Sequence, residues 1–177
     1  PISRRIYSLV KIIVNDADIL IDLVDLKILP YFFQLEFEFH TTVIILDELF
    51  DKQQEALFPY IETRQLRVDN ITEEDFMEIL MIRARKPNLS EQDCSAFYQA
   101  QKLNAALITS DNKLRKFAQA NHIEIYGHLW VFDNLVNKSI ITGKTATEKL
   151  SELCNVVNPK LGLPKSECQK RIKLWSK

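Results

Sequence analysis

Residues 11–18 read Lys-Ile-Ile-Val-Asn-Asp-Ala-Asp, an apolar run that ends in a group of acids. Three consecutive β-branched residues favour a strand that is buried on both faces. The acids precede a stretch of helical period, and Asp is a favoured residue at the start of a helix. The segment therefore predicts a β-strand that passes at once into an α-helix.

The same alternation continues to residue 126. Further β-branched runs predict strands, and apolar residues at three-to-four spacing between them predict helices. Such alternation favours a three-layer α/β/α fold with a mostly parallel central sheet of about five strands. The expected strands are residues 11–14, 42–45, 66–68, 106–109 and 123–126.

Only helical patterns follow Gly127, over residues 128–137, 145–156 and 164–176. No linker is long or polar enough to separate a second domain. We therefore expect an α/β domain over residues 9–137, with a C-terminal helical extension over residues 138–177 packed on the same domain.

Glycine is scarce in this chain. Its three glycines, Gly127, Gly143 and Gly162, fall far below the usual ~7% and never approach one another in sequence. No glycine-rich loop of the kind that cradles phosphate can be formed from them. Dinucleotide-binding folds and P-loop NTPases of the usual type are therefore excluded.

The cysteines and the hydropathy pattern indicate a compartment. Three cysteines without a C-x-x-C pair support neither a disulfide framework nor a zinc finger. No apolar run approaches the ~18 residues of a membrane helix, and no signal-peptide core is recognisable. We therefore expect a soluble, cytoplasmic protein without a membrane partner.

Charge is divided along the chain. Residues 1–110 carry 11 Lys and Arg against 18 Asp and Glu, whereas residues 111–177 carry 12 against 6. An acidic part joined to a basic part is typical of proteins that bind a polyanion. A solvated face of the last helix, residues 164–176, would explain the basic charges equally well.

Acids follow the expected strands at the positions where parallel sheets bind ligands. Asp16, Glu48 and Asp111 come after three strands, and Asp93 lies at the start of the helix that leads to the strand before Asp111. Ligand sites of such sheets lie outside the carboxyl ends of the strands, so we expect these carboxylates to converge. Clustered carboxylates without an interleaved lysine favour a hard cation such as Mg²⁺ or Mn²⁺.

Helix capping is the alternative explanation of the same acids. Asp16, Asp18 and Asp111 each stand before a helical pattern, and Asp93 could form a capping box with Ser90. Glu48 could be a first-turn acid favoured by the helix dipole. The two explanations are compatible, because helix N-termini help to keep carboxylates ionised.

Four segments, in this order, resemble the motifs of the PIN domain. They are VNDADILI (14–21), TTVIILDEL (41–49), LSEQDCSA (89–96) and LITSDNKLR (107–115). The resemblance implies a nuclease that depends on Mg²⁺ or Mn²⁺ and cleaves single-stranded RNA, as the VapC-type toxins of bacterial toxin–antitoxin pairs do. The matching metal-binding and catalytic acids are Asp16, Glu48, Asp93 and Asp111.

Two residues depart from the family pattern. Asp18 occupies a position where many members have Asn or Ser, so it is either a fifth ligand or a capping residue. Arg115 stands where some members have a further acid or Asn, which puts a second metal in doubt and makes it a candidate phosphate contact. The candidate substrate-binding residues are Thr109, Ser110, Asn112, Lys113 and Arg115.

Other functions and partners stay open at this point. A PIN-like module without activity could bind RNA or protein through the same scaffold. A haloacid-dehalogenase-like phosphatase would use Asp16 as nucleophile and Asp18 as general acid, because D-x-D after a strand is also its pattern. Residues 19–33 are more apolar than one helix face requires, so an antitoxin or a second copy of the chain could cover them. A pair of buried short helices is the alternative.

Overall fold

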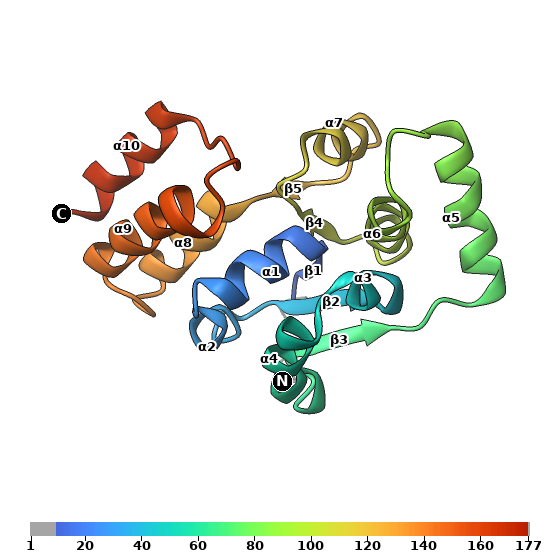
Figure 1. The fold of residues 1–177 in the computed structure, drawn as a ribbon, viewed down its shortest axis with the longest axis horizontal. Coiled ribbons are helices and arrows are strands. Elements are labelled where there is room, and N and C mark those ends of the chain that lie inside the picture. Colours follow the sequence, from blue (N-terminus) through green and yellow to red (C-terminus); the bar gives the residue numbers. More distant parts are fainter. Residues whose placement is uncertain (1–9, 177) are drawn as a thin grey trace, which may run out of the picture.

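The computed structural model describes residues 10–176 of the 177-residue chain. Its strands form one sheet in the order β3-β2-β1-β4-β5, and every neighbouring pair is parallel. They are β1 (Ile12–Asn15), β2 (Glu38–Thr42), β3 (Leu66–Asp69), β4 (Ala106–Ile108) and β5 (Ile125–Tyr126). The expected five-stranded parallel sheet is confirmed, with β1 at its centre (Figure 1).

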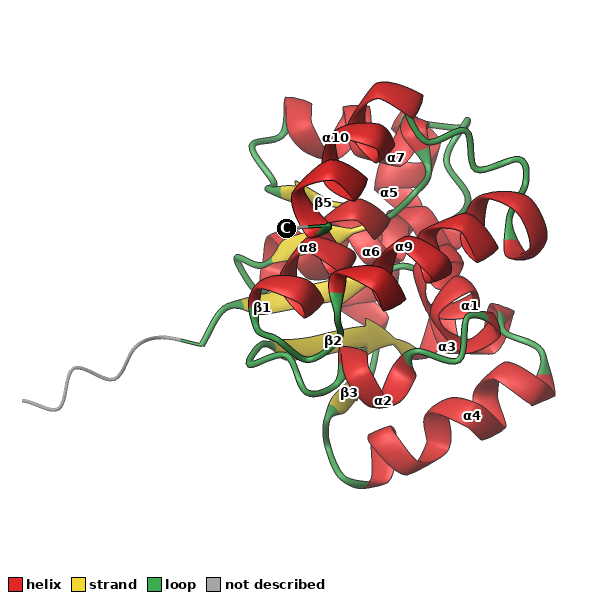
Figure 2. Cartoon of the chain, turned by 90° about the vertical axis from the view of Figure 1, so that its left-hand side faces the viewer, coloured by secondary structure: helices red, strands yellow, loops and turns green. Residues whose placement is uncertain are grey.

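Helices cover both faces of this sheet (Figure 2). Because parallel crossovers are right-handed, the connections from β1 through β2 to β3 lie on one face, and the returning connections through α6 and α7 lie on the other. The three-layer α/β/α arrangement is thus confirmed. The helices are α1 (Ala17–Asp25), α2 (Leu29–Phe32), α3 (Val43–Glu48), α4 (Asp51–Glu62), α5 (Glu73–Arg85), α6 (Glu91–Lys102), α7 (Asn112–Ala120), α8 (His128–Asn137), α9 (Gly143–Glu152), the π-helical turn η1 (Leu153–Val157) and α10 (Lys165–Trp175).

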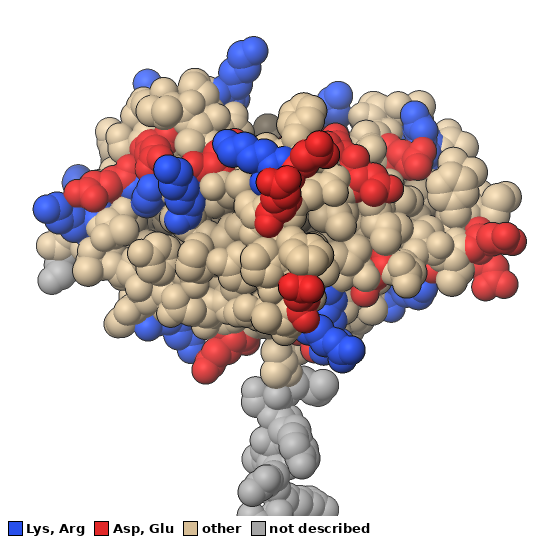
Figure 3. Space-filling view, turned by 60° about the horizontal axis from the view of Figure 1, so that its bottom comes forward, with Lys and Arg blue, Asp and Glu red and all other residues tan. Residues whose placement is uncertain are grey.

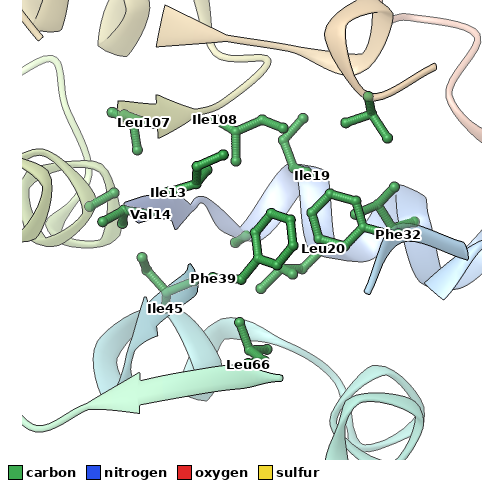
Figure 4. Packing of buried hydrophobic residues seen from close by; sticks show 14 of the residues in the cluster. Ile13, Val14, Ile19, Leu20, Phe32, Phe39, Ile45, Leu66, Leu107 and Ile108 are labelled. Carbon is green, nitrogen blue, oxygen red and sulfur yellow. The ribbon is translucent and has the colours of Figure 1, made fainter. Parts of the chain in front are cut away.

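The core lies where β1 and β4 meet the helices. Ile13 and Leu107 of these strands are fully buried, as are Ile19 and Leu20 of α1 (Figure 4). Strands covered on both faces need continuous apolar runs, which accounts for the β-branched sequence of β1. Burial of each such side chain contributes about 1.5–3 kcal/mol relative to exposure. The central strands and the elements that follow them are therefore firmly held.

The expected strand over residues 42–45 is wrong. The strand β2 ends at Thr42, and the Thr42 hydroxyl accepts a hydrogen bond from the Ile45 amide at 3.3 Å, which begins the helix α3. A short apolar run does not distinguish a buried strand from a buried helical turn, and here the capping Thr decides. Glu48 consequently lies at the C-terminal end of a helix, and neither a strand end nor a helix start positions it.

The C-terminal helices pack on the same core. Ala146, Leu150 and Leu153 are buried, and α9 and η1 contact α8 and α1 respectively. The helix α10 has no fully buried residue, and it contacts α8 and α9. The boundary expected after residue 137 coincides with the last residue of α8.

The apolar segment 19–33 forms α1 and α2. Its large apolar side chains are buried in the core, except for Ile21, which is half-buried, and Tyr31, which is exposed. The paired-helix alternative therefore accounts for this segment, which leaves little apolar surface for a partner. Within residues 10–176, no helix combines the length and hydropathy needed to cross a membrane.

Candidate functional site

Two of the candidate acids follow neighbouring strands. Strands β1 and β4 pair so that Asn15 lies opposite Ile108. The residues that follow the two strands therefore lie at the same edge of the sheet. Asp16 follows directly on β1, and Asp111 starts α7 shortly after β4. Since the strand order reverses at β1, this is the switch point where parallel sheets bind ligands.

Asp16 is buried at this edge, with 3% of its surface exposed. Its Oδ1 accepts a hydrogen bond from the Ala17 amide at 2.8 Å, and its Oδ2 accepts one from the Thr109 hydroxyl at 2.6 Å. Burial, together with the charges of Asp93 and Asp18, raises the pKa of Asp16 to about 7, although both hydrogen bonds act against the rise. Such a carboxyl group changes its protonation state near neutral pH.

Asp111 caps α7 and is linked to Asp16 through one side chain. Its Oδ1 accepts hydrogen bonds from the amides of Lys113 at 2.8 Å and Leu114 at 2.7 Å. Its own amide donates to the Thr109 hydroxyl at 3.1 Å, and that hydroxyl donates to Asp16. Thr109 therefore fixes the two carboxylates relative to each other.

Asp93 arrives from a different part of the chain. Its Oδ2 accepts a hydrogen bond from the Ser90 amide at 2.8 Å, and its amide donates to the Ser90 hydroxyl at 3.0 Å, which completes a capping box at the start of α6. The Asp93 charge raises the pKa of Asp16, Asp18 and Glu48. Asp93 therefore lies within electrostatic reach of all three.

Glu48 and Asp18 complete the group. Burial raises the pKa of Glu48, and the charges of Asp18 and Asp93 add to that rise. Burial also raises the pKa of Asp18, with further contributions from Asp22, Asp93 and Asp111. Helix α1 holds Asp18 in its first turn, so Asp16 and not Asp18 is the capping residue.

The capping explanation and the clustering explanation thus both hold for Asp16, Asp93 and Asp111. The charges of Asp93 and Asp111 raise the pKa of neighbouring carboxyl groups, but the acids are not gathered into one coordination shell. Among residues 10–176, no three Asp, Glu, His or Cys side chains are spaced to hold a metal ion. Five carboxylate side chains make this edge of the sheet acidic. Asp16 and Asp111 precede α1 and α7, and the others lie on α1 (Asp18), α3 (Glu48) and α6 (Asp93).

The domain that carries this acidic edge is similar to a known protein family. A family model described as a PIN domain matches residues 12–176. The chain belongs to the PIN-domain family. No curated protein matches it. PIN domains are generally nucleases, so a nuclease-type family and the acidic edge agree.

The family match spans more of this PIN domain than its α/β part. It begins at the first strand and continues through α9 and α10, which lie in the expected extension over residues 138–177. The phosphatase alternative gains nothing from this match. In addition, both oxygens of Asp16, its proposed nucleophile, already accept hydrogen bonds.

The predicted substrate-binding residues of the PIN domain divide into two places. Ser110, Asn112 and Arg115 line a cavity of about 510 Å³ beside the acidic edge. Lys113 lines a separate groove of about 410 Å³ together with Lys86 and Lys116. Asn112 lines the first of these cavities and Lys113 the second, so the first turn of α7 borders both.

The side chains of Thr109 and Arg115 are less available to a substrate than the sequence suggested. The Thr109 side chain is buried, and its hydroxyl is used by Asp16 and Asp111, so it positions the site and does not offer this group to a substrate. Arg115 Nη1 donates to the carbonyl oxygens of Thr109 at 3.0 Å and Tyr126 at 2.9 Å. Part of its guanidinium therefore joins the loop after β4 to the end of β5.

Sequence patterns missed a second buried polar contact of the PIN domain. Asp22 of α1 accepts hydrogen bonds from Asn158 at 3.0 Å and pairs with His128 at 2.8 Å, and both Asp22 and His128 are almost fully buried. The His128 charge lowers the pKa of Asp18, against the acids that raise it. A charged residue on the apolar face of α1 was the available signal.

Asn15 is the other residue that patterns missed. It is fully buried next to Asp16, and its amide nitrogen donates to the His40 carbonyl oxygen at 3.0 Å. Its Oδ1 is buried without a hydrogen-bond partner in the structure. An unpaired buried oxygen is costly, and it adds to the excess of acceptors at this edge.

Proposed function

We propose that this protein is a divalent-metal-dependent endoribonuclease that cleaves phosphodiester bonds of single-stranded RNA. The observation that carries the proposal is the placement of Asp16 and Asp111 at neighbouring strand ends, joined through the Thr109 hydroxyl, where the charges of Asp93 and Asp18 act against the ionised form of Asp16. A protein gains nothing in stability from such repulsion, so a function that needs concentrated negative charge is the physical explanation. Membership of a nuclease-type family supports the same reading.

The donor set suits Mg²⁺ or Mn²⁺ by its chemistry. Every candidate ligand offers hard carboxylate oxygens, and hydrogen bonds within residues 10–176 leave Asp93 Oδ1 and Asp111 Oδ2 free. Asp16, Asp93 and Asp111 would hold the ion, with Asp18 as a further ligand. When bound, a divalent ion supplies charge that stabilises phosphoryl oxygens and activates water.

The residues of the chain then have distinct tasks. Thr109 holds Asp16 and Asp111 in place through its hydroxyl. Glu48, with its raised pKa, is suited to take the proton of an attacking water at its carboxylate. Lys113 and Lys116, in the groove that they line with Lys86, would position the phosphate backbone without reading sequence.

Cleavage assays on unstructured RNA test this function. Asp16→Asn and Glu48→Gln should each lower cleavage in Mg²⁺ or Mn²⁺ by at least 100-fold, because each removes a catalytic or ligating charge. Asp47→Asn is the matched control for Glu48, since Asp47 is exposed and adjacent in sequence. Undiminished cleavage by Asp16→Asn would overturn the assignment.

A non-catalytic RNA- or protein-binding PIN module is the second candidate. It is favoured by the absence of a preformed group of three ligands in residues 10–176, and by the capping bonds that engage Asp16, Asp93 and Asp111. Calorimetric titration with Mn²⁺ separates the two candidates. Saturable binding that Asp111→Asn abolishes supports the nuclease, whereas no heat of binding supports the module.

The toxin role is a further part of the proposal. A toxin would arrest growth when expressed alone, and an antitoxin protein would mask it. The protein could also act as a homodimer. Induced expression of the wild type and of Asp16→Asn tests toxicity, since only an active toxin should depend on that carboxylate.

A further inference from the structure

The cavity of about 510 Å³ beside the acidic edge joins the α/β part to the C-terminal helices. Ser110 and Asn112, which flank Asp111 in sequence, lie on one side, and Leu163 of the loop before α10 lies on the other. Its volume is in the range of small-molecule sites. A ligand in it would lie beside Ser110 and Asn112, the two sequence neighbours of Asp111.

The wall formed by α8 and α10 is held in place by several contacts. The rings of Tyr126 and Trp130 stack with centroids 4.2 Å apart and planes 9° from parallel. Arg171 donates to Asp133 at 2.7 Å and to Glu167 at 2.7 Å. These contacts fix the wall without a ligand, so the cavity is largely preformed.

The lining favours a flat, uncharged group over a phosphate. Leu161, Leu163 and Pro164 supply apolar surface on one side. The charge of Arg171 is already matched by Asp133 and Glu167, and Arg115 of the same lining uses its Nη1 to bind the carbonyl oxygens of Thr109 and Tyr126. The separate groove lined by Lys86, Lys113 and Lys116 is better suited to bind phosphate groups.

We propose that this cavity binds one nucleobase of a single-stranded RNA, from a nucleotide that flanks the phosphate at the acidic edge. The proposal rests on the proposed function for the class of substrate. A strand that crosses the first turn of α7 would place phosphates over the lysine groove, the reacting phosphate near Asp111, and the flanking base in the cavity. Aromatic and apolar walls hold bases in this way in other single-strand sites.

Equilibrium binding without catalysis tests the cavity. Fluorescence anisotropy in EDTA would compare a short single-stranded RNA with copies that carry one abasic nucleotide, moved stepwise along the strand. For the full chain, one abasic position should weaken binding on the order of 10-fold, as loss of a bound base typically does. Leu163→Trp fills the cavity, so it should bind the intact RNA as weakly as the abasic one.

Lys116→Ala is the matched control. It removes a backbone charge, so it should weaken intact and abasic RNA by the same factor and leave their ratio unchanged. An equal affinity of the wild type for every abasic copy overturns the proposal. So does a Leu163→Trp protein that still distinguishes the two RNAs.

A second measurement needs no variant and so does not depend on its folding. The chain has two tryptophans, of which Trp130 lines the cavity and Trp175 does not. Intact RNA should shift the indole NMR signal of Trp130 more than that of Trp175, and the abasic copy should remove the difference. Equal shifts with both RNAs overturn the proposal.

The outcomes separate this proposal from the nuclease. Base-dependent binding without cleavage in Mn²⁺ would leave the cavity assigned and the nuclease rejected. Cleavage without any abasic effect would do the reverse.

Discussion

Asp16 couples protonation to metal binding at the residue scale. Its pKa is raised to about 7, chiefly by burial, so it holds a proton in the folded protein over a pH range where an unfolded Asp has lost it. The unfolded state therefore binds fewer protons between pH 4 and 7. Without metal, the contribution of Asp16 to the free energy of unfolding falls as the pH rises through this window.

The first prediction follows from this coupling. In EDTA, urea unfolding should show that Asp16→Asn gains stability relative to the wild type as the pH is raised from 4 to 8. The affinity of the wild type for Mn²⁺ should increase over the same range, because the ion binds the deprotonated carboxylate. A stability difference that does not change with pH would contradict the raised pKa.

Thr109 supports the second prediction. Thr109→Val keeps the shape of the side chain but removes the bonds to Asp16 and to the Asp111 amide. We expect a loss of about 1–3 kcal/mol in the free energy of unfolding and a further rise in the pKa of Asp16, because its Thr109 hydrogen bond lowers that pKa. NMR titration of the Asp16 carboxyl carbon measures the rise. Thr109→Ser restores the hydroxyl and should restore the pKa.

The residue types at this edge were readable from the sequence, but the roles of their neighbours were not. Asp16 and Asp111 follow apolar runs, so their position at adjacent strand ends could be predicted. The use of the Thr109 hydroxyl depends on β1 and β4 being neighbours, a pairing across more than 90 residues. A pattern within a short segment of sequence cannot reveal a contact between residues so far apart in the chain. The pairing of Asp22 with His128 was hidden for the same reason.

At the scale of elements, the pair α5 and α6 depends on one buried carboxylate. Asp75 accepts hydrogen bonds from Lys102 at 2.8 Å and from the Tyr98 hydroxyl at 2.7 Å, and it closes a capping box with Thr72. The Lys102 contact, followed by Tyr98, lowers the pKa of Asp75 well below its ordinary value of 3.8. The hydrogen bond from Tyr98 to Asp75 raises the pKa of Tyr98 to about 12. The ionised carboxylate of Asp75 therefore stabilises the contact between the two helices.

The third prediction concerns Asp75→Asn, which should lower the free energy of unfolding by about 1–2 kcal/mol at pH 7, because the half-buried Tyr98 hydroxyl and the exposed Lys102 lose a charged acceptor. A lowered pKa contributes stability above the unfolded value and loses it as the pH falls. The difference from the wild type should therefore shrink below pH 4 in urea titrations. Glu78→Gln, an exposed change on the same helix, should have little effect.

The boundary between β2 and α3 shows why elements are harder to place than residues. Val43, Ile44 and Ile45 are β-branched and favour a strand by themselves. Tertiary packing overrides that preference, because Ile45 is fully buried when α3 turns back toward α6. A cap at Thr42 was the only local signal, and it also fits a strand residue.

At the scale of the whole molecule, the division of charge along the chain does not translate directly into a surface that binds a polyanion. On the face in Figure 3, acidic and basic side chains are interspersed around a broad uncharged area. Arg171, one of the C-terminal basic residues, is paired with Asp133 and Glu167. Only part of the positive charge after residue 110 is therefore available to a polyanion. The Lys86, Lys113 and Lys116 groove also draws one of its lysines from the acidic half.

The packing of α10 against α9 depends on a glycine. A Cβ built on Gly143, at the start of α9, would lie 1.8 Å from the carbonyl oxygen of Trp175. The obstructing atom is backbone, so α10 would have to move. Gly143 does not have a positive φ, and its role is therefore the close approach of two helices and not an unusual conformation.

Gly143→Ala is the fourth prediction. Helix propensity alone would make alanine stabilising by up to about 1 kcal/mol, but the overlap with Trp175 should outweigh it and lower the free energy of unfolding by about 1–3 kcal/mol. Urea unfolding measures the sign, and Lys144→Ala, an exposed change in the same turn, is the control. A more stable Gly143→Ala protein would mean that α10 is not held against α9. Because α10 also carries Glu167 and Arg171 into the cavity wall, its displacement should move the Trp130 indole signal as well.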